Sequence, residues 1–541
     1  MKFARCYAWL LACALVVGCL TGCQSGEGAS AETRITLTDD GIQTEGVNSG
    51  AVKVTNDIIY YEDRDTYDSG NPYGEGEAAD RHTAEEAAAH TVVNITDPGT
   101  YRLSGKLSAG QIRVDLGEEA KTDPESVVTL ILDGVDISCG VAPAILFLSV
   151  YECDHDWSAE TATKDVDTSA AGANLHLAAN SVNVVNGAYV ARIYKDAEGE
   201  KKLWKQDGAI YSYMSMNVDG LGQLTVNAEN EGLDTELHLT INGGYIEILS
   251  GNDGINTNED GVSVTTINDG EVRIIAGLGQ EGDGIDSNGW LVINGGKVFA
   301  SAHPAADAGL DSDMGSYING GQVVAFGSTM DWAESDSAQV TVNLQFAQGM
   351  SARSLLSIRN ESGESFFAPR ATEEDDPTAD RTYRGAIISD PFLKQGETYT
   401  VYVDEVQQAY TGTDVMRGPG GFGGRPGGQM GQRPEGEMPQ MPQGEMPQRP
   451  EGEMPQRPEG GMPQRPEGGM PQRPEGEMPK WEGGEMPDFD QGQMTQFPEG
   501  EVPPYASLWT PGQQTGEQMP PSTEFYMQDM VNFFSGVTAA E

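Results

Sequence analysis

Basic side chains are scarce in this chain of 541 residues, which carries 32 Lys and Arg against 84 Asp and Glu and a formal net charge of −52 at pH 7. Region 207–350 contains two basic residues, Arg273 and Lys297. Proteins that bind nucleic acid present clustered Lys and Arg, so this composition excludes nucleic acid as a partner. An acidic surface of this kind is either simply solvated or neutralised by bound divalent cations. Carboxylates that recur in register at turns favour the cations.

Cysteine is equally rare. Six cysteines occur in the whole chain, and four of them lie in the first 23 residues. The other two, Cys139 and Cys153, could form a disulfide outside the cytoplasm or remain as two buried thiols.

A long apolar run occurs once, between the basic start 1–5 and Val17, and it is interrupted by small and polar residues. A membrane-spanning helix needs about 20 apolar residues, and no other segment could span a bilayer. The run is followed by Leu20-Thr21-Gly22-Cys23, which is typical of a bacterial lipobox. We therefore expect residues 1–23 to be a lipoprotein signal, and lipidated Cys23 to anchor the chain on the extracellular face of the bacterial cell membrane. A poorer second match ends at Cys19.

One motif recurs four times between residues 231 and 321. Each copy has an apolar residue, an Asp/Asn pair around Ser or Thr, a short strand and a turn that begins with Asn. The copies are EGLDTELHLTINGG, DGINTNEDGVSVTTINDG, DGIDSNGWLVINGG and AGLDSDMGSYINGG. Their turn residues Asn242, Asn268, Asn294 and Asn319 follow at intervals of 26, 26 and 25 residues, a period that is typical of a solenoid.

The strands of this repeat alternate in polarity. After each turn two apolar residues stand two positions apart, as at Ile246 and Ile248, so one face of each strand is buried. A strand this short cannot bury its face alone, but rungs stacked about 4.8 Å apart can. The pattern predicts an all-β fold, a parallel β-helix with one rung per repeat. A β-roll would show a nonapeptide period, and a propeller blade needs about 40 residues.

Composition divides the rest of the chain. Residues 24–90 are polar and indicate a mostly flexible tether with one strand-like patch at 51–61, whereas strand patterns begin at Thr91 and continue through 91–337, the β-helix. Residues 338–412 have the texture of antiparallel strands, and we expect a small C-terminal β cap that covers the open end of the solenoid. Residues 413–541 are rich in Pro, Gly and Met and predict a disordered tail that serves as a spacer or interacts with the cell wall.

The recurring Asp and Asn residues predict a metal site. Stacked rungs place them in columns at one turn, and calcium prefers such carboxylate and amide oxygens. The candidate ligands are Asp234, Asp253, Asn256, Asn258, Asp283, Asp286, Asn288, Asp307, Asp311 and Asp313. The alternative is an asparagine ladder in which Asp forms turns without metal. Asp253 and Asp283, which are additional to the turn, favour calcium; Glu231 and Ala308 at the same position weaken the expectation of metal at the outer rungs.

Residues 91–405 resemble the carbohydrate-binding β-helix proteins of cellulolytic clostridia, which are related in fold to polysaccharide lyases. The resemblance rests on GTYRLSG at 99–105, TLILDGVDI at 129–137, the repeated Asp-Gly-Ile blocks and GETYTV at 396–401. It implies a right-handed parallel β-helix, calcium at the rung turns, and affinity for polysaccharide, including acidic glycans.

Sugar rings stack on exposed aromatic side chains. Alternation with Leu291 and Ile293 predicts that Trp290 points outward, close to the acidic turns, and Tyr317 occupies a similar position. A Trp that is partly buried under a loop would fit the same pattern. We expect these two residues to contribute to carbohydrate binding.

The sequence leaves rival functions. A calcium-dependent polysaccharide lyase needs a Lys or Arg base, and Arg273 and Lys297 would lie on adjacent rungs. Glu247 and Glu271 would face them, however, and such ion pairs keep both bases protonated. We therefore expect a cell-surface lipoprotein that binds plant cell-wall or acidic polysaccharide without cleaving it. A lyase and a non-catalytic adhesin or scaffold are the alternatives.

Overall fold

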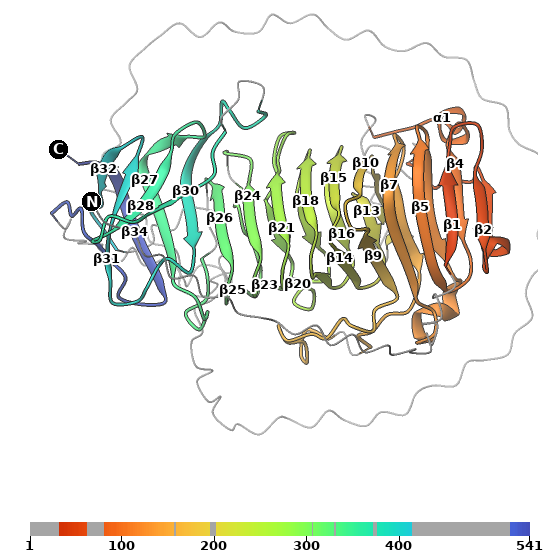
Figure 1. The fold of residues 1–541 in the computed structure, drawn as a ribbon, viewed down its shortest axis with the longest axis horizontal. Coiled ribbons are helices and arrows are strands. Elements are labelled where there is room, and N and C mark those ends of the chain that lie inside the picture. Colours follow the sequence, from red (N-terminus) through yellow and green to blue (C-terminus); the bar gives the residue numbers. More distant parts are fainter. Residues whose placement is uncertain are drawn as a thin grey trace, which may run out of the picture. The chain divides into compact units, whose positions relative to one another are not determined.

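The computed structural model describes residues 32–61, 80–155, 158–194, 202–305, 307–328, 332–371, 376–413 and 520–540, which all belong to one compact unit. These residues form 34 strands, one short α-helix and two 3-10 helices (Figure 1). The prediction of an all-β chain is confirmed. None of the helices in the described part of the chain is long and apolar enough to cross a membrane.

Most strands pair in three series, which we call the first, second and third ladders. The first ladder pairs in parallel from β4 to β22 and begins with an antiparallel strand, β3. Its strands are β3 (Val52–Thr55), β4 (Thr91–Ile95), β6 (Gly110–Asp115), β8 (Ile145–Ser149), β13 (Gly208–Ser212), β16 (Glu231–Thr235), β19 (Ile255–Thr257) and β22 (Ile285–Ser287).

The second and third ladders are parallel throughout. The second ladder consists of β1 (Thr33–Leu37), β5 (Gly99–Leu107), β7 (Val128–Cys139), β9 (Ala173–Leu177), β14 (Met216–Gly220), β17 (Leu239–Ile241), β20 (Val264–Ile267), β23 (Trp290–Ile293) and β25 (Gly315–Ile318). The third continues from the end of β7 through β10 (Val182–Gly187), β15 (Gln223–Ala228), β18 (Tyr245–Ser250), β21 (Glu271–Ile275), β24 (Lys297–Ser301) and β26 (Gln322–Gly327). Figure 1 shows β15, β18, β21, β24 and β26 side by side.

The alternation predicted from sequence sets the core. Ile246 and Ile248 are fully buried, and their equivalents on the later rungs join them in one apolar cluster that extends along the three ladders. Val272 pairs in register with both Ile246 and Val298, so like side chains stack from rung to rung. The parallel pairing is compatible with a β-helix, and the β-helix and its right-handed winding both stay predictions.

An asparagine ladder joins the turns after the second-ladder strands. The Nδ2 atom of Asn268 donates to Oδ1 of Asn242 over 2.8 Å, Asn294 donates to Asn268 over 2.9 Å, and Asn319 donates to Asn294 over 2.9 Å. The side-chain amides therefore repeat the backbone hydrogen bonding at the edge of each rung, which accounts for the recurrence of Asn in the sequence.

The N-terminal boundary of the β region was wrong. Residues 33–55, predicted to belong to a polar tether, supply β1, β2 (Gln43–Gly46), η1 (Ser49–Ala51) and β3. Strand β1 pairs in parallel with β5, and its apolar side chains Ile35 and Leu37 are fully buried. A short helix, α1 (Ala84–Ala88), precedes β4, and η2 (Glu118–Thr122) follows β6. The strand-like patch at 51–61 contains β3, whereas the polar composition around β1 and β2 concealed those two strands.

Antiparallel strands follow β26, as predicted for residues 338–412. They are β27 (Thr341–Ser351), β28 (Leu356–Asn360), β29 (Ser365–Phe367), β30 (Thr382–Ser389), β31 (Thr398–Val403) and β32 (Val406–Ala409). Strand β30 pairs antiparallel with both β26 and β27, which covers the last strand of the third ladder.

The predicted disordered tail, 413–541, is wrong in its last part. β33 (Phe525–Tyr526) pairs with β31, and β34 (Val531–Ala539) pairs with β27 and β32. The Met-Pro-Gln-Arg repeats lie outside the described residues. The C-terminal segment packs into the cap because its apolar side chains, among them Phe525, Phe534 and Val537, belong to the core of the cap.

Two long segments, between β8 and β9 and between β10 and β13, differ in structure. Residues 151–155 and 158–171, which we call the strap, connect β8 to β9, whereas β11 (Val190–Tyr194) and β12 (Lys202–Gln206) form a separate hairpin. Cys139 and Cys153 are both free thiols, so the disulfide alternative is not realised.

Candidate functional site

The carboxylate columns predicted from sequence lie along the first ladder. Asp234 pairs in register with Asn256, and Asn256 with Asp286. A bridge between Ile285 and Leu310 continues the stack toward Asp311. The ladder therefore brings one oxygen-bearing side chain from each rung into a single row.

The second row is also stacked. The backbone N–H groups of Asn258, Asn288 and Asp313 each donate to a carbonyl of the preceding rung, over 3.0, 2.9 and 3.0 Å. The Asn258 amide donates to Asp234, and that of Asn288 donates to the Asn258 carbonyl over 2.8 Å. These amides already have hydrogen-bond partners, as the asparagine-ladder alternative predicts for this row.

Glycines keep the two rows close. A Cβ on Gly232 would collide with the carbonyl oxygen of Gly254 on the next rung. In the same way, a Cβ on Gly254 would collide with the carbonyl oxygen of Gly284, and one on Gly284 with that of Gly309. These residues stand between the acidic residue that opens each repeat and the apolar residue that enters the core. The close rung contact places Glu231, Asp253 and Asp283 beside the row formed by Asp234.

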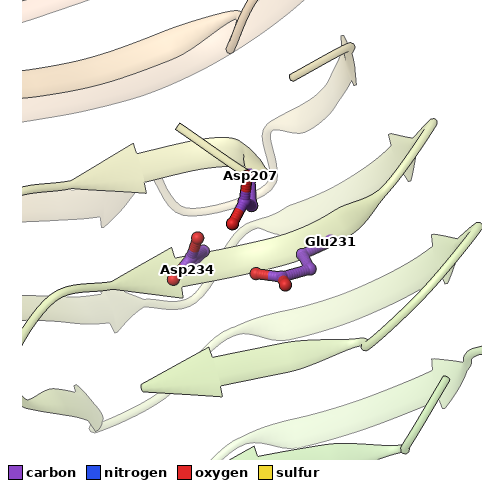
Figure 2. Close-up of side chains that lie close together, drawn as sticks. All are labelled: Asp207, Glu231 and Asp234. Atoms are coloured by element: carbon purple, nitrogen blue, oxygen red, sulfur yellow. The ribbon is translucent and has the colours of Figure 1, made fainter. Parts of the chain in front are cut away.

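Three carboxylates meet at the start of the row. One oxygen each of Asp207, Glu231 and Asp234 lie within 4.8 Å of one another (Figure 2). Glu231 is 4% exposed, and its Oε1 accepts from Asn256 over 3.2 Å, but its Oε2 has no hydrogen-bond partner. Oδ1 of Asn256 is likewise buried without a donor. Buried oxygens without a donor beside two further carboxylates form the chemistry that a hard cation needs.

Farther along the row, burial and neighbouring negative charges disfavour ionisation of Asp253 and Asp283. Burial first, then the neighbouring Glu231, Asp286 and Asp283, raises the pKa of Asp253 well above its usual range. Burial, followed by the charge of Asp311, raises the pKa of Asp283 to about 8. Asp253 Oδ1 accepts the N–H of Asp283 over 2.7 Å, and this hydrogen bond lowers the pKa of Asp253 without cancelling the rise caused by burial. Carboxylates in this environment would ionise readily only with a counter-charge.

The outermost predicted ligands are less enclosed. Burial, with the charges of Asp311 and Asp260, raises the pKa of Asp313. Asp311 Oδ1 accepts the N–H of Ser312 over 2.8 Å. Oδ2 of Asp307 lies 3.5 Å from Nδ1 of His303, but this buried oxygen accepts no hydrogen bond. All ten predicted ligands lie on or beside the first ladder, but the densest cluster is at the other end of the carboxylate row, where β13 and β16 pair.

Two members of that cluster were missed from sequence. Asp207 precedes β13, a strand that lacks the Asp/Asn pair, so the repeat search passed over it. Glu231 was interpreted as a departure from the Asp of the middle copies. The Asp-Gly pair at 207–208 resembles those at 253–254 and 283–284, and this resemblance was the signal that could have located Asp207.

Trp290 is not the exposed platform but the covered Trp of the alternative. The side chain points away from the core that holds Leu291 and Ile293, but it is 9% exposed. Val264 and Val292 flank it, and Ala162 and Val166 of the strap pack on the same cluster. Alternation identifies which side of a strand faces away from the core, but it cannot show that a distant insert covers that side.

Tyr317 is half-buried on the same face. The ammonium of Lys164, also from the strap, lies 5.1 Å from the centre of its ring. The ring is therefore occupied by a cation–π contact, and a role in sugar stacking stays a prediction.

The predicted ion pairs of the third ladder are present. Arg273 lies 3.5 Å from Glu247, and Lys297 lies 3.4 Å from Glu271. The Arg273 guanidinium also stacks 4.6 Å from the ring of Phe299. Both cations are on the third ladder, whereas the carboxylate rows are on the first.

Comparison with known proteins agrees with the family resemblance. A relative from Acetivibrio thermocellus, described as a carbohydrate-binding domain-containing protein, is 29% identical over 240 residues, which are 44% of this chain and 63% of that protein. The chain thus matches less than two thirds of that relative's length. A solved structure of the polysaccharide lyase-like protein from C. thermocellum, a gadolinium derivative, has a TM-score of 0.32 and 23% identity, with 54% of this chain and 92% of that chain covered. A TM-score this low carries no argument. The family model of the carbohydrate-binding domain-containing protein matches residues 89–364, just over half of the chain, which therefore belongs to that family.

Proposed function

We propose that this chain binds polysaccharide at the cell surface, and that calcium bound by the first-ladder carboxylates holds the binding domain in its folded form. Membership of the carbohydrate-binding family and the name of its relative support the polysaccharide. The three ladders, which are parallel apart from β3, support a parallel β-helix as the scaffold, and the family resemblance supports its right-handed winding. The lipobox at Cys23, which lies outside the described residues, supports a lipid anchor on the extracellular face.

The observation that carries the calcium is the Glu231 carboxylate. One of its oxygens is buried without a donor, beside Asp207 and Asp234. An uncompensated carboxylate in such a place costs several kcal/mol, and a divalent cation would offset that cost for the whole cluster. Asp207, Glu231, Asp234 and Asn256 would hold the ion here, and Asp253, Asp283 and Asp286 would hold one farther along. The ion supplies positive charge and fixed coordination of oxygens.

Binding without cleavage is favoured over a lyase. A lyase base must be unprotonated to remove a proton, and both third-ladder cations are paired with glutamates. They also belong to a different ladder from the carboxylates. A structural adhesin would use the same rungs without affinity for glycan.

One experiment separates these functions. The chain without residues 1–23 is titrated with neutral polysaccharides and with polygalacturonate, in millimolar calcium and in chelator, while absorbance reports unsaturated products. Binding without products supports the proposal, and products that disappear in Lys297→Ala or Arg273→Ala would establish a lyase. Binding to no glycan would leave the adhesin.

Calcium itself is tested by Glu231→Gln. Calcium at about a hundredfold excess over its dissociation constant should stabilise the wild type by about 2.7 kcal/mol. The variant should lose much of this gain. Glu247→Gln, a change of the same kind on the third ladder, is the control, and equal calcium responses in both variants would refute the site.

A further inference from the structure

A groove runs along the outer side of the second ladder, away from the carboxylate rows. Its volume is about 600 Å³. Outward side chains of successive strands form the floor, which includes Asn217 on β14, Thr240 on β17 and Thr266 on β20. Strap residues 164–169 form one wall, and the asparagine ladder forms the opposite edge.

The strap is fixed in place. Both oxygens of the buried Glu152 accept from Ser215, over 2.7 and 2.9 Å. The Thr168 hydroxyl is hydrogen-bonded to Oδ1 of Asn217 over 2.8 Å and to the Thr240 hydroxyl over 2.7 Å. Val166 packs in the cluster around Trp290. The groove is therefore bounded by an anchored wall, and the same strap that buries Trp290 creates the groove beside it.

The chemistry of the lining selects a class of ligand. The ladder amides of Asn242, Asn268 and Asn294 are exposed, and each has two N–H groups, of which a ladder hydrogen bond uses at most one. Amides and hydroxyls both donate and accept, as sugar hydroxyls do. Since these groups recur at the rung spacing of about 4.8 Å, they match a ligand that is itself a linear repeat.

The negative charge at the rim of the groove restricts the class of polysaccharide that can bind there. Asp165, Asp167 and Asp219 border the groove, and the one cation in its lining, Lys164, lies 3.1 Å from Asp165. A polyuronate would be repelled here. On the basis of the proposed polysaccharide binding, we infer that a neutral polysaccharide lies along this groove, with its hydroxyls on the asparagine ladder and on Thr266 of the floor.

Paired variants test the groove. Thr266→Arg fills the floor while the ladder stays intact, and the double variant Asn268→Ala, Asn294→Ala removes ladder amides. The matched control is Asn186→Ala, Asn227→Ala, because Asn227 donates to Asn186 over 2.7 Å on the third ladder, outside the groove lining. Soluble glucan, xylan and mannan are titrated calorimetrically, and polygalacturonate is titrated in parallel.

We expect both groove variants to weaken binding of a neutral glycan by about tenfold or more, and the control to bind as wild type does. Melting temperature and its response to calcium should match between the groove and control double variants. If wild type binds a neutral glycan and both groove variants bind it equally well, the groove assignment is overturned while the proposed function stands. Binding of polygalacturonate alone would also overturn it, and binding of no glycan would overturn both.

Discussion

The last 21 described residues close the cap, and their removal should open it. Strand β34 pairs with β27 and β32, and Phe525, Met527, Phe534 and Val537 are at most 3% exposed. The rings of Phe525 and Phe534 lie 4.9 and 4.7 Å from that of Tyr410. A chain that ends at residue 413 would lose all these contacts.

The loss is large on the scale of protein stability. Each buried side chain of this kind contributes about 1.5–3 kcal/mol, so the four together amount to at least about 6 kcal/mol before the entropy of ordering the segment is subtracted. Whole domains are stable by about 5–15 kcal/mol. The cap core is separate from the core of the three ladders, so the cap should melt first and the ladders should persist.

The control keeps the segment and removes the intervening sequence. Tyr410 and Ser522 exchange backbone hydrogen bonds of 2.9 and 3.0 Å, so a short Gly/Ser linker can replace residues 414–519. Calorimetry and limited proteolysis should show a cap transition like that of the full chain with the linker, and an early transition for the chain that ends at 413. If the truncated chain melts like the full chain, the packing argument is refuted.

Other predictions follow from the site and the sequence. Because the folded pKa of Asp283 is raised to about 8 from 3.8, its contribution to calcium-free stability should be complete below about pH 4 and be lost as the pH rises to about 8; calcium should reduce this loss in melting curves, and its absence in chelator would contradict the burial argument. Glu231→Gln should raise the melting temperature in chelator, since it removes a buried charge; a decrease would indicate a structural hydrogen bond. Arg273→Ala and Lys297→Ala should each change the free energy of unfolding by about 1 kcal/mol or less, measured by chemical denaturation. Cys23→Ser should release the protein from the membrane fraction; continued attachment would show that another residue anchors it.

Sequence reasoning predicted the features that repeat. Period-two burial located the strands that hold Ile246 and Val272, and the recurrence of Asn located a ladder of turn amides. It failed where distant parts of the chain meet. The burial of Trp290 depends on the strap, and the role of β34 depends on a cap from which it is separated by more than a hundred residues. Neither contact leaves a periodic pattern.

For the turns of the first ladder, the sequence offered two alternatives, bound calcium or hydrogen-bonded asparagines without metal, and each describes a different part of the row. Where the row carries amides, at Asn258 and Asn288, the side chains donate to neighbouring oxygens and need no ion. At the start of the row, Glu231 lies beside Asp207 and Asp234, and its buried Oε2 accepts no hydrogen bond. The demand for a cation is therefore strongest at the first copy of the repeat, where the replacement of Asp by Glu had weakened the expectation of metal. The longer side chain lets the carboxylate reach toward the preceding rung, which supplies Asp207 in place of the missing Asp/Asn pair.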